Sequence, residues 1–398
     1  MTTQTKTTWR TVRLDEGEGL SLIIDHRGIT PKKLGGVWSS AGIPALSAKN
    51  IKDGRIVSQA DIRYVDQKLY ERWMPEKLEH GDILLTSEAP LGEVYFLNEK
   101  ADYCLSQRLF ALRVNPAALD SSYLYYYLKS SKGQHQLMRR ISGTAAQGIR
   151  QAELRKIEFS VPSDTEEQKH IAETLSVFDD KIENNNRIIK TLEEMAQAIF
   201  KEWFVNFRFP GHEKVELVDS ALGKIPKGWE VRNVMEIVKR IPVGKKYENK
   251  TALLIGKVPI LDQGQSGCIG YHNDEPGVIA SIDEPVVVFT NHTCNYRLIT
   301  YSFSAIQNVL PYVGKNGYST LFVYYLTREK IVMQEYKGYW PEFEQQEFVV
   351  SPQTLAEEYT IIIKPMMHKI VEAENENQKL ATMRDLLLPR LMSGEIKV

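Results

Sequence analysis

The sequence predicts an α+β protein in which two globular α/β domains alternate with two long helices, so that one plan is written twice along the chain. Three observations carry this prediction. Residues 165–205 follow a heptad pattern of apolar positions, residues 359–391 repeat that pattern at a shift of 188, and a strand-rich segment precedes each of them. Self-similarity of this kind indicates a tandem repeat with pseudo-two-fold symmetry.

The length and composition fit a folded chain of several domains. The 398 residues, 42% of them hydrophobic, are enough for two or three ordinary domains. There is no apolar run of about 18 residues, and the start MTTQTKTTWR lacks the apolar core of a secretory signal, so we expect a cytoplasmic protein without membrane contact. The three scattered cysteines, Cys104, Cys268 and Cys294, fit a reducing compartment and are expected to be buried thiols.

The first globular domain is expected at residues 1–155. GDILLTSEAPLGEVYFL, at 81–97, has the pattern of a strand pair, and SSYLYYYLKS, at 121–130, that of an aromatic helix. Its tyrosines could offer stacking platforms for bases, but the helical spacing of Leu124, Tyr127 and Leu128 favours packing in a core.

The first long helix is expected at residues 156–206. Its apolar stripe advances by alternating steps of four and three residues, as in a coiled coil. A helix of about 40 residues would be roughly 60 Å long, so it needs an equally long partner. One stripe position is polar, Asn185. The stripe consists of Ile171, Leu175, Phe178, Ile182, Asn185, Ile189, Leu192, Ala196, Ile199 and Trp203.

The second half follows the same plan. Proline, glycine and charged residues at 207–227 indicate a linker, which leads to a second globular domain at 228–350 and a second long helix within 351–398. Because Pro365 interrupts the stripe, we expect the long helix to begin near it, after a short helix at 354–363. The second stripe consists of Tyr359, Ile363, Met366, Ile370, Ala373, Asn377, Leu380, Arg384, Leu387 and Leu391.

The charge distribution allows nucleic-acid contact only through local patches. Net charge is −1, but residues 1–155 carry 22 lysines and arginines against 17 acidic residues. The basic loop at 139–156 is therefore the first DNA-contact candidate, the alternative being a solvated loop. Its glycines, Gly143 and Gly148, would let the backbone approach a duplex. Its candidate contact residues are Arg139, Arg140, Thr144, Gln147 and Arg150.

In the second domain the matching loop, YKGYWPEFEQQ at 336–346, is aromatic and acidic, so Tyr339 and Trp340 are expected to pack rather than read bases. The basic cluster at 239–250 is the better candidate for phosphate contact, and an exposed lysine-rich loop is the alternative. The candidates in this cluster are Lys239, Arg240, Lys245 and Lys246.

Catalytic and metal motifs are weak. LIGKVP and YVGKNG lack the leading glycine and the hydroxyl residue of a phosphate-binding loop, and no Asn/Asp-Pro-Pro-aromatic tetrapeptide of adenine methyltransferases is present. Cys268, His272, His292 and Cys294 have no common zinc spacing, so no metal site is expected. The acidic pair Asp179 and Asp180 is expected to form a solvated face or a partner-docking surface rather than a magnesium site.

Three stretches resemble the specificity subunits of type I DNA restriction-modification systems. They are LRKIEFSVPSDTEEQKHIAETLSVFDDKI (154–182), LGKIPKGWEV (222–231) and LLLPRLMSGEIKV (386–398), and they follow one another in that family's order along nearly the whole chain. The second junction, VVSPQTLAEEYTIIIKPMMHKI, departs from the first because it lacks the Glu-Gln pair.

The resemblance implies an architecture and a role. Two α/β target-recognition domains would be separated by two antiparallel coiled-coil helices, each domain would read one half of a split double-stranded DNA target, and the helices would set the gap. Two methyltransferase subunits would dock on the helices, and motor subunits would join for restriction. The chain itself would be non-catalytic and bind no cofactor, with S-adenosylmethionine, ATP and Mg²⁺ on its partners. The residues expected between helices and subunits are Leu175, Phe178, Ile182, Asn185, Ile189, Leu192, Ile370, Asn377, Leu380 and Leu387.

Two other classes remain open. The chain could be a restriction or methylation enzyme in its own right, or a coiled-coil adaptor that does not bind DNA.

In an antiparallel pairing, Asn185 and Asn377 could meet near the middle of the helices, where a buried polar contact would fix the register.

Overall fold

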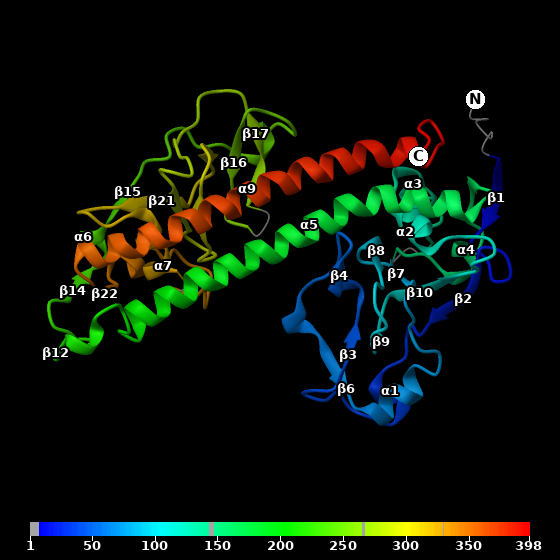
Figure 1. Cartoon of the computed structure of the whole chain (residues 1–398), viewed down its shortest axis with the longest axis horizontal. Coiled ribbons are helices and arrows are strands. Elements are labelled where there is room, and N and C mark those ends of the chain that lie inside the picture. Colours follow the sequence, from blue (N-terminus) through cyan, green and yellow to red (C-terminus); the bar gives the residue numbers. More distant parts are fainter. Residues whose placement is uncertain (1–7, 143–146, 265–266, 329) are drawn as a thin grey trace. The chain divides into compact units, whose positions relative to one another are not determined.

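The computed structural model describes residues 8–142, 147–264, 267–328 and 330–398 and divides into two compact units. Unit 1 comprises residues 1–182 and 379–398, and unit 2 comprises residues 183–378. Each unit contains an α/β body and a stretch of both long helices (Figure 1). Every helix in the described ranges is too short or too polar to cross a membrane.

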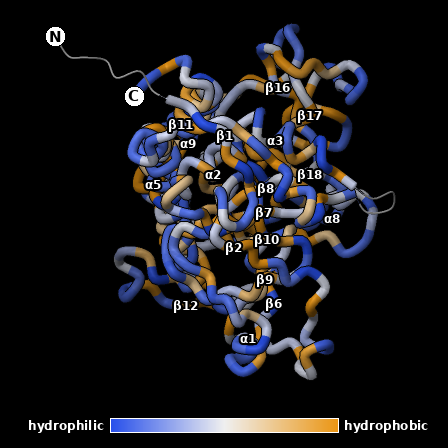
Figure 2. The backbone as a smooth tube through the Cα atoms, turned by 90° about the vertical axis from the view of Figure 1, so that its right-hand side faces the viewer, coloured by the Kyte–Doolittle hydropathy of each residue, from blue (hydrophilic) through white to orange (hydrophobic). Residues whose placement is uncertain are grey.

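The α/β body of unit 1 is built around a four-stranded sheet in the order β2-β10-β7-β8. The central strand β7 is buried at every residue because both sheet faces are covered. Ile83 and Leu85 enter one hydrophobic core, while the alternating Leu84 enters another. Figure 2 shows hydrophobic stretches of the backbone, in orange, in the region of β7 and β10. The elements before the long helix are β1 (Trp9–Arg13), β2 (Leu20–Asp25), η1 (Pro31–Leu34), β3 (Ile43–Leu46), η2 (Ala48–Asn50), β4 (Ile51–Lys52), β5 (Arg55–Ile56), η3 (Gln59–Asp61), β6 (Arg63–Val65), α1 (Gln67–Trp73), β7 (Ile83–Ser87), β8 (Leu91–Phe96), β9 (Cys104–Leu105), β10 (Leu109–Val114), α2 (Ser121–Lys129), α3 (Ser131–Met138), α4 (Gln151–Leu154) and β11 (Glu158–Pro162).

Unit 2 repeats this topology. Its four-stranded sheet runs β15-β21-β18-β19, its pair β14-β22 corresponds to β1-β11, and its sheet β17-β16-β20 corresponds to β6-β3-β9. The predicted repeat is therefore confirmed for these three sheets, whereas the pairs β4-β5 and β12-β13 have no counterpart in the part of the chain that the structure describes. The elements are β12 (Leu217–Ser220), β13 (Gly223–Pro226), β14 (Glu230–Asn233), α6 (Val234–Ile237), β15 (Val238–Arg240), η6 (Asn249–Thr251), β16 (Val258–Leu261), β17 (Cys268–His272), β18 (Val286–Thr290), β19 (Tyr296–Ile299), β20 (Ser304–Ala305), β21 (Val309–Gly314), α7 (Thr320–Thr327), α8 (Trp340–Glu344) and β22 (Glu347–Val350).

The two aromatic helices, α2 and α7, lie in the cores of their units, as predicted. Asp120 and Ser319 cap them by accepting hydrogen bonds from Tyr123 N and Phe322 N. The tyrosines at 123, 125, 126 and 127 are all buried. The alternative of stacking platforms for bases is therefore not supported for α2.

The boundaries of the first long helix differ from the prediction. The helix α5 (Thr165–Phe200) begins later than residue 156, because Glu158–Pro162 form β11, which pairs antiparallel with β1. It continues into a π-helical turn, η4 (Lys201–Val205), and is followed by a 3-10 turn, η5 (His212–Lys214). The expected linker at 207–227 is also partly folded. It forms the hairpin β12-β13, and Phe209 and Ile225 are buried in the core of unit 2.

The second long helix, α9 (Gln353–Leu391), is continuous through Pro365, so the predicted short helix at 354–363 and restart near Pro365 are wrong. Pro365 has no backbone N–H to donate, so one carbonyl of the preceding turn lacks its helical hydrogen bond. Because Pro365 is exposed, that carbonyl can bind water instead. The opposite side of the same stretch is held by Tyr359, Ile363 and Met367, which are buried in the core of unit 2. Packing of these residues, which come before and after the proline in sequence, offsets the local cost of the proline.

Replacing Pro365 by alanine is expected to raise the free energy of unfolding of the chain by about 1–3 kcal/mol, because proline in a helix interior costs about 3 kcal/mol relative to alanine. Urea unfolding followed by far-UV circular dichroism measures the change. Pro352, which directly precedes α9, is the matched control, since proline at a helix start costs little. An equal gain from Pro352→Ala would show that the position of Pro365 is unimportant.

The predicted stripes face each other in each unit, and the predicted meeting of the asparagines is confirmed. In unit 2, Asn185 Nδ2 donates to Asn377 Oδ1 at 3.0 Å and to Glu376 Oε2 at 2.7 Å. Farther along α5, Tyr359 donates its hydroxyl to the carbonyl of Ala196 at 3.1 Å. Rising numbers on α5 thus meet falling numbers on α9, so the stretches of the two helices in this unit are antiparallel. The Asn185 side chain is 2% exposed.

In unit 1 the stretches of α5 and α9 are joined by a charged cluster. The Asp179 carboxylate accepts hydrogen bonds from Arg384 and from the Tyr126 hydroxyl, and Lys129 Nζ lies 3.5 Å away. Burial lowers the pKa of Lys129, and the facing cation Arg384 adds to this effect, whereas Asp179 opposes it. Asp179 is therefore an internal tie between α2, α5 and α9, and its predicted place on a solvated face is wrong, whereas Asp180 is exposed as predicted.

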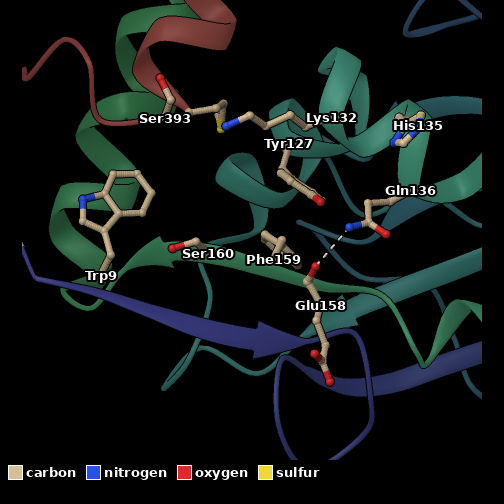
Figure 3. A pocket seen from close by; sticks show the side chains of 10 residues that line it. Trp9, Tyr127, Lys132, His135, Gln136, Glu158, Phe159, Ser160 and Ser393 are labelled. Carbon is tan, nitrogen blue, oxygen red and sulfur yellow. Dashed lines mark hydrogen bonds between the residues drawn. The ribbon is translucent and has the colours of Figure 1, made fainter.

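The C-terminal end of α9 packs on the first strand of unit 1. A Cβ atom on Gly394 would lie 2.7 Å from the Trp9 ring, so only glycine fits against that ring. The adjoining pocket of about 420 Å³ is lined by Trp9 and Ser393, and the Tyr127 and Phe159 rings in its wall are stacked 3.8 Å apart (Figure 3). In unit 2 Trp229 contacts Phe204, beyond the end of α5, with 5.9 Å between ring centres. Trp9 and Trp229 thus have the same role in the two units.

Candidate nucleic-acid interface

The basic segment of unit 1 lies on the turn between β7 and β8. Gly148 forms bridges with Glu88 and Ser142, and Ile149 N donates to the Ser87 carbonyl at 2.9 Å. A Cβ on Gly148 would be 2.8 Å from that carbonyl oxygen, so the glycine permits close approach to the turn. The predicted approach of Gly148 to a duplex stays a prediction. Gly143 lies outside the described residues, as does the candidate Thr144.

The contact of the basic segment with the turn between β7 and β8 encloses a hollow of about 340 Å³, whose wall comes from four loops of unit 1. Sequence patterns identified only Arg150 among its charged residues. The hollow is lined by Arg27, Gly28, Ser87, Glu88, Gln107, Arg108, Ser142, Gly148, Ile149 and Arg150. Arginine and amide side chains in one concave place are suited to hydrogen bonding with base edges and phosphates.

Two arginines of the hollow are held in fixed orientations. Arg27 forms two hydrogen bonds of 2.7 Å with Asp25, and its guanidinium lies over the Phe110 ring at 4.1 Å. Arg108 Nε lies 2.9 Å from Glu88 Oε1. A planar guanidinium oriented by a carboxylate loses little freedom when it binds a further acceptor.

The other cations of the segment divide into exposed and internal ones. Arg139, Gln147 and Arg150 are exposed, and their side chains have no hydrogen-bond or ion-pair partner among the residues that the structure describes. Arg140 instead donates to the Gln136 and Lys156 carbonyls at 3.2 and 2.9 Å.

Arg155 pairs with Asp15 and Glu16, at 2.9 and 2.7 Å, so its charge is neutralised within unit 1. The segment therefore offers Arg139, Gln147 and Arg150 as its open donors, and these remain the predictions for direct contact.

In unit 2 the equivalent segment docks on the equivalent turn. The Asn291 carbonyl accepts from Tyr339 N at 2.9 Å, and its side-chain oxygen accepts from Trp340 N at 2.8 Å. His292 Nδ1 lies 2.7 Å from the Lys337 carbonyl, and its ring stacks on Tyr336. Tyr339 and Trp340 are buried in the core of unit 2, which confirms that they pack.

The predicted basic cluster of unit 2 begins on β15, an edge strand of the sheet. Lys239 and Lys246 are exposed. The Arg240 guanidinium lies 5.4 Å from the centre of the Trp340 ring, which connects it to the docked segment. Lys245 Nζ pairs with Asp274 at 2.9 Å, and this hydrogen bond raises the pKa of Lys245. Lys239, Arg240 and Lys246 are thus the cations most open to a phosphate.

One backbone feature recurs in both units and was missed in the sequence. Arg108 and Asn308 directly precede β10 and β21 and have positive φ angles of 70° and 67°. Their carbonyls accept from Ser87 N and Asn291 N, the first residues of the two turns, at 2.8 and 2.9 Å. Positive φ is uncommon for arginine, and backbone strain clusters at functional sites. The Gln-Arg and Gln-Asn pairs at 107–108 and 307–308, a shift of 200, are the signal that could have revealed it.

The cysteine and histidine residues considered for zinc have other contacts. His272 Nδ1 accepts from Asp274 N at 3.1 Å, and Cys268 Sγ donates to the Gly270 carbonyl. Cys104 and Cys294 are buried, and burial raises their thiol pKa values to about 12 and about 11, whereas Cys268 is partly exposed. Within the described ranges, no three His, Cys, Asp or Glu side chains are grouped as metal ligands.

Comparisons with known proteins give a consistent result. Residues 22–194 match the family described as the type I restriction modification DNA specificity domain. The MjaIX specificity subunit of a type I restriction enzyme from Methanocaldococcus jannaschii is 26% identical over 93% of this chain and 90% of its own length. A putative type I specificity subunit of Mycoplasma genitalium, S.MgeORF438P, is 30% identical over 47% of each chain. The crystal structure of an S subunit from M. genitalium shares the fold, with a TM-score of 0.59 and 18% identity over 98% of both chains.

Proposed function

Because the chain belongs to the specificity subunits of type I restriction-modification systems, we propose that each of its two target-recognition domains reads one half of a split double-stranded DNA target. One observation supports this proposal above the others. Both units carry a docked loop and a positive-φ residue at the same place of the same strand topology, but with different side chains there. One scaffold with two sets of side chains suits two different half-site sequences.

Arg108 and Asn308 are the base-reading positions of this proposal. Arginine presents paired donors to guanine, and asparagine pairs with adenine, through the major groove. Arg108 is held by Glu88 in a hollow that also contains Gln107. The two residues therefore differ in the base that they favour while occupying equivalent places.

The experiment is a pair of matched variants. Arg108→Ala is expected to relax one half-site and Asn308→Ala the other, each at about 1–3 kcal/mol of discrimination against the wrong base. Mapping methylated adenines in cells that carry the chain and its methyltransferase partner measures the motif. Each variant is the control for the other, because the untouched half-site must keep its sequence. If either variant changed both half-sites, or neither changed any, the assignment would be wrong.

The exposed cations of unit 1 are proposed to contact phosphates. Arg139→Gln and Arg150→Gln are each expected to lower the slope of log K against log salt concentration by about one, because one fewer counterion is released. Fluorescence anisotropy of a labelled target duplex, titrated with the chain and its methyltransferase partner at several salt concentrations, measures the slope. Arg155→Gln should leave the slope unchanged, since Arg155 is already paired. If Arg139→Gln and Arg150→Gln kept the slope of the natural chain, this segment would not belong to the interface.

The partners are proposed from the same family. Two methyltransferase subunits would dock on the outer faces of α5 and α9, which expose large apolar side chains at Val177, Ile361 and Leu386. Motor subunits would join for restriction. S-adenosylmethionine, ATP and Mg²⁺ would bind to these partners, and this chain would provide recognition without chemistry. Methyl transfer or cleavage by the purified chain alone would favour the alternative of an enzyme.

A further inference from the structure

Two polar contacts between the long helices, Asp179–Arg384 and Asn185–Asn377, have apolar residues at the equivalent positions one repeat away. At the repeat shift of 188, Asp179 corresponds to Met367 and Arg384 to Ala196. The same shift relates Asn185 to Ala373 and Asn377 to Ile189. The two helices are thus similar in their apolar stripes but complementary in their polar positions.

The structure places these residues opposite one another. In unit 1, Asp179 faces Arg384, with 26% and 16% of their side chains exposed. Their repeat equivalents, Ala196 and Met367, are both buried in the core of unit 2. Within unit 2, Asn185 faces Asn377, and this register also puts Ile189 opposite Ala373. Charge therefore meets charge, amide meets amide, and apolar residues meet each other.

Pairing of a helix with its own copy would break these matches. An α5 laid antiparallel on the α5 of a second chain, in this register, places Asp179 against Ala196 and Asn185 against Ile189. For α9 on a second α9, Arg384 meets Met367 and Asn377 meets Ala373. The Asp179–Arg384 and Asn185–Asn377 contacts are then lost twice, once in each copy, while the apolar stripes still match. Asp179 keeps Lys129 and Tyr126, and Arg384 keeps Asp385, but neither charge has a partner on the facing helix. A largely buried charge that loses its main partner is unfavourable, and polar stripe residues are known devices for partner choice in coiled coils.

We propose that Asp179–Arg384 and Asn185–Asn377 form a pairing code that directs α5 onto α9 and rejects pairing with a second copy of the same helix. Such selection is needed because the repeat makes the two helices near-equivalent in their apolar residues. The code acts by making the two self-paired complexes less stable, because polar groups there lie opposite apolar residues, rather than by raising the affinity of the correct pair. The inference concerns the pairing of the chain with itself and holds whether or not DNA is the ligand.

The test uses a full chain that is cut once. A protease site is placed at Gly211, where an added Cβ atom would meet no other atom within 4 Å. Cleavage after folding gives two separate pieces, one with α5 and one with α9. Mixed α5–α9 complexes then compete with complexes of two identical pieces. Nicked protein is incubated for exchange, and native mass spectrometry counts the mixed and self-paired complexes. The equalised variant carries Asp179→Met, Arg384→Ala, Asn185→Ala and Asn377→Ile, with Lys129→Thr to remove the freed cation, as at Thr327 in unit 2.

The nicked natural chain is expected to give mixed complexes at least about tenfold in excess over each self-paired one, and the equalised variant a distribution near the statistical 1:2:1. A reversed pair, Asp179→Arg with Arg384→Asp and with Lys129→Thr to remove the cation beside position 179, should stay mixed, because its charges still match only between the two helices. Glu183→Ala with Arg187→Ala, which removes an exposed pair within α5, should also stay mixed. If the equalised variant stayed mixed or fell into single pieces, or if the natural chain gave all complexes, the code would be refuted.

Discussion

Lengthening both long helices by three heptads is expected to widen the gap in the DNA target while both half-site sequences stay the same. The insertions belong between Ile182 and Glu183 in α5 and between Gln378 and Lys379 in α9, at the boundary of the two units. Twenty-one residues add about 32 Å at about 1.5 Å per residue, close to the roughly 34 Å of one DNA turn. The gap should therefore grow by about 9–10 base pairs.

An insertion of three heptads preserves both the facing of the helix stripes and the rotational position of the second half-site on the DNA. Whole heptads keep the apolar stripes of the helices facing each other, and nearly one DNA turn keeps the second half-site on the same face of the duplex. One heptad adds about 10 Å and turns the DNA by roughly a third of a turn, so weaker binding is expected. The new motif is measured by mapping methylated adenines. Changed half-site sequences would contradict the separation of reading from spacing.

Removing the guanidinium of Arg384 is expected to have the largest effect on stability. Arg384→Leu leaves the Asp179 carboxylate, which is 26% exposed, with only Lys129 at 3.5 Å and the Tyr126 hydroxyl. Breaking a buried pair on one side costs about 3–5 kcal/mol, and the remaining cation reduces this to about 2–3 kcal/mol in the free energy of unfolding. Urea unfolding followed by far-UV circular dichroism measures the loss.

Arg390→Leu is the matched control for this prediction. It breaks the ion pair with Glu395 near the end of the same helix, where both side chains are more than half exposed. Exposed pairs contribute less than about 1 kcal/mol. If Arg384→Leu cost no more than Arg390→Leu, the cluster around Asp179 would not hold α5 and α9 together in unit 1.

The sequence predicted what depends on periodicity. The stripes, the repeat and the aromatic helices follow from the spacing of residues along the sequence. The meeting of Asn185 with Asn377 follows from the stripes together with the antiparallel arrangement that the family resemblance implied, and the structure confirms all of these predictions. Pro365 was misjudged because its cost is local, whereas the gain from Tyr359 and Ile363 depends on packing against segments distant in sequence.

The binding hollow could be predicted only in part. Arg150 was found because it lies in a basic run, but Arg27, Glu88 and Arg108 come from three other loops and meet only after the sheet forms. For the same reason, the contact of Gly148 with the Ser87 carbonyl was not predicted, since the two residues are distant in sequence. Asp179 likewise has neighbours of like and opposite charge on its own helix, so nothing local indicated Tyr126 or Arg384 as partners.

The most direct test of the central claim is a hydroxyl-radical footprint of the chain, bound with its methyltransferase partner, on a duplex that carries the methylated motif. The account predicts two protected segments, one over each half-site, with Arg108→Ala weakening protection of only one of them and Asn308→Ala only of the other. A single continuous footprint, or equal loss of both segments in either variant, would contradict the reading of a split target by two separate units. Protection by the methyltransferase alone would show that this chain is an adaptor that does not bind DNA.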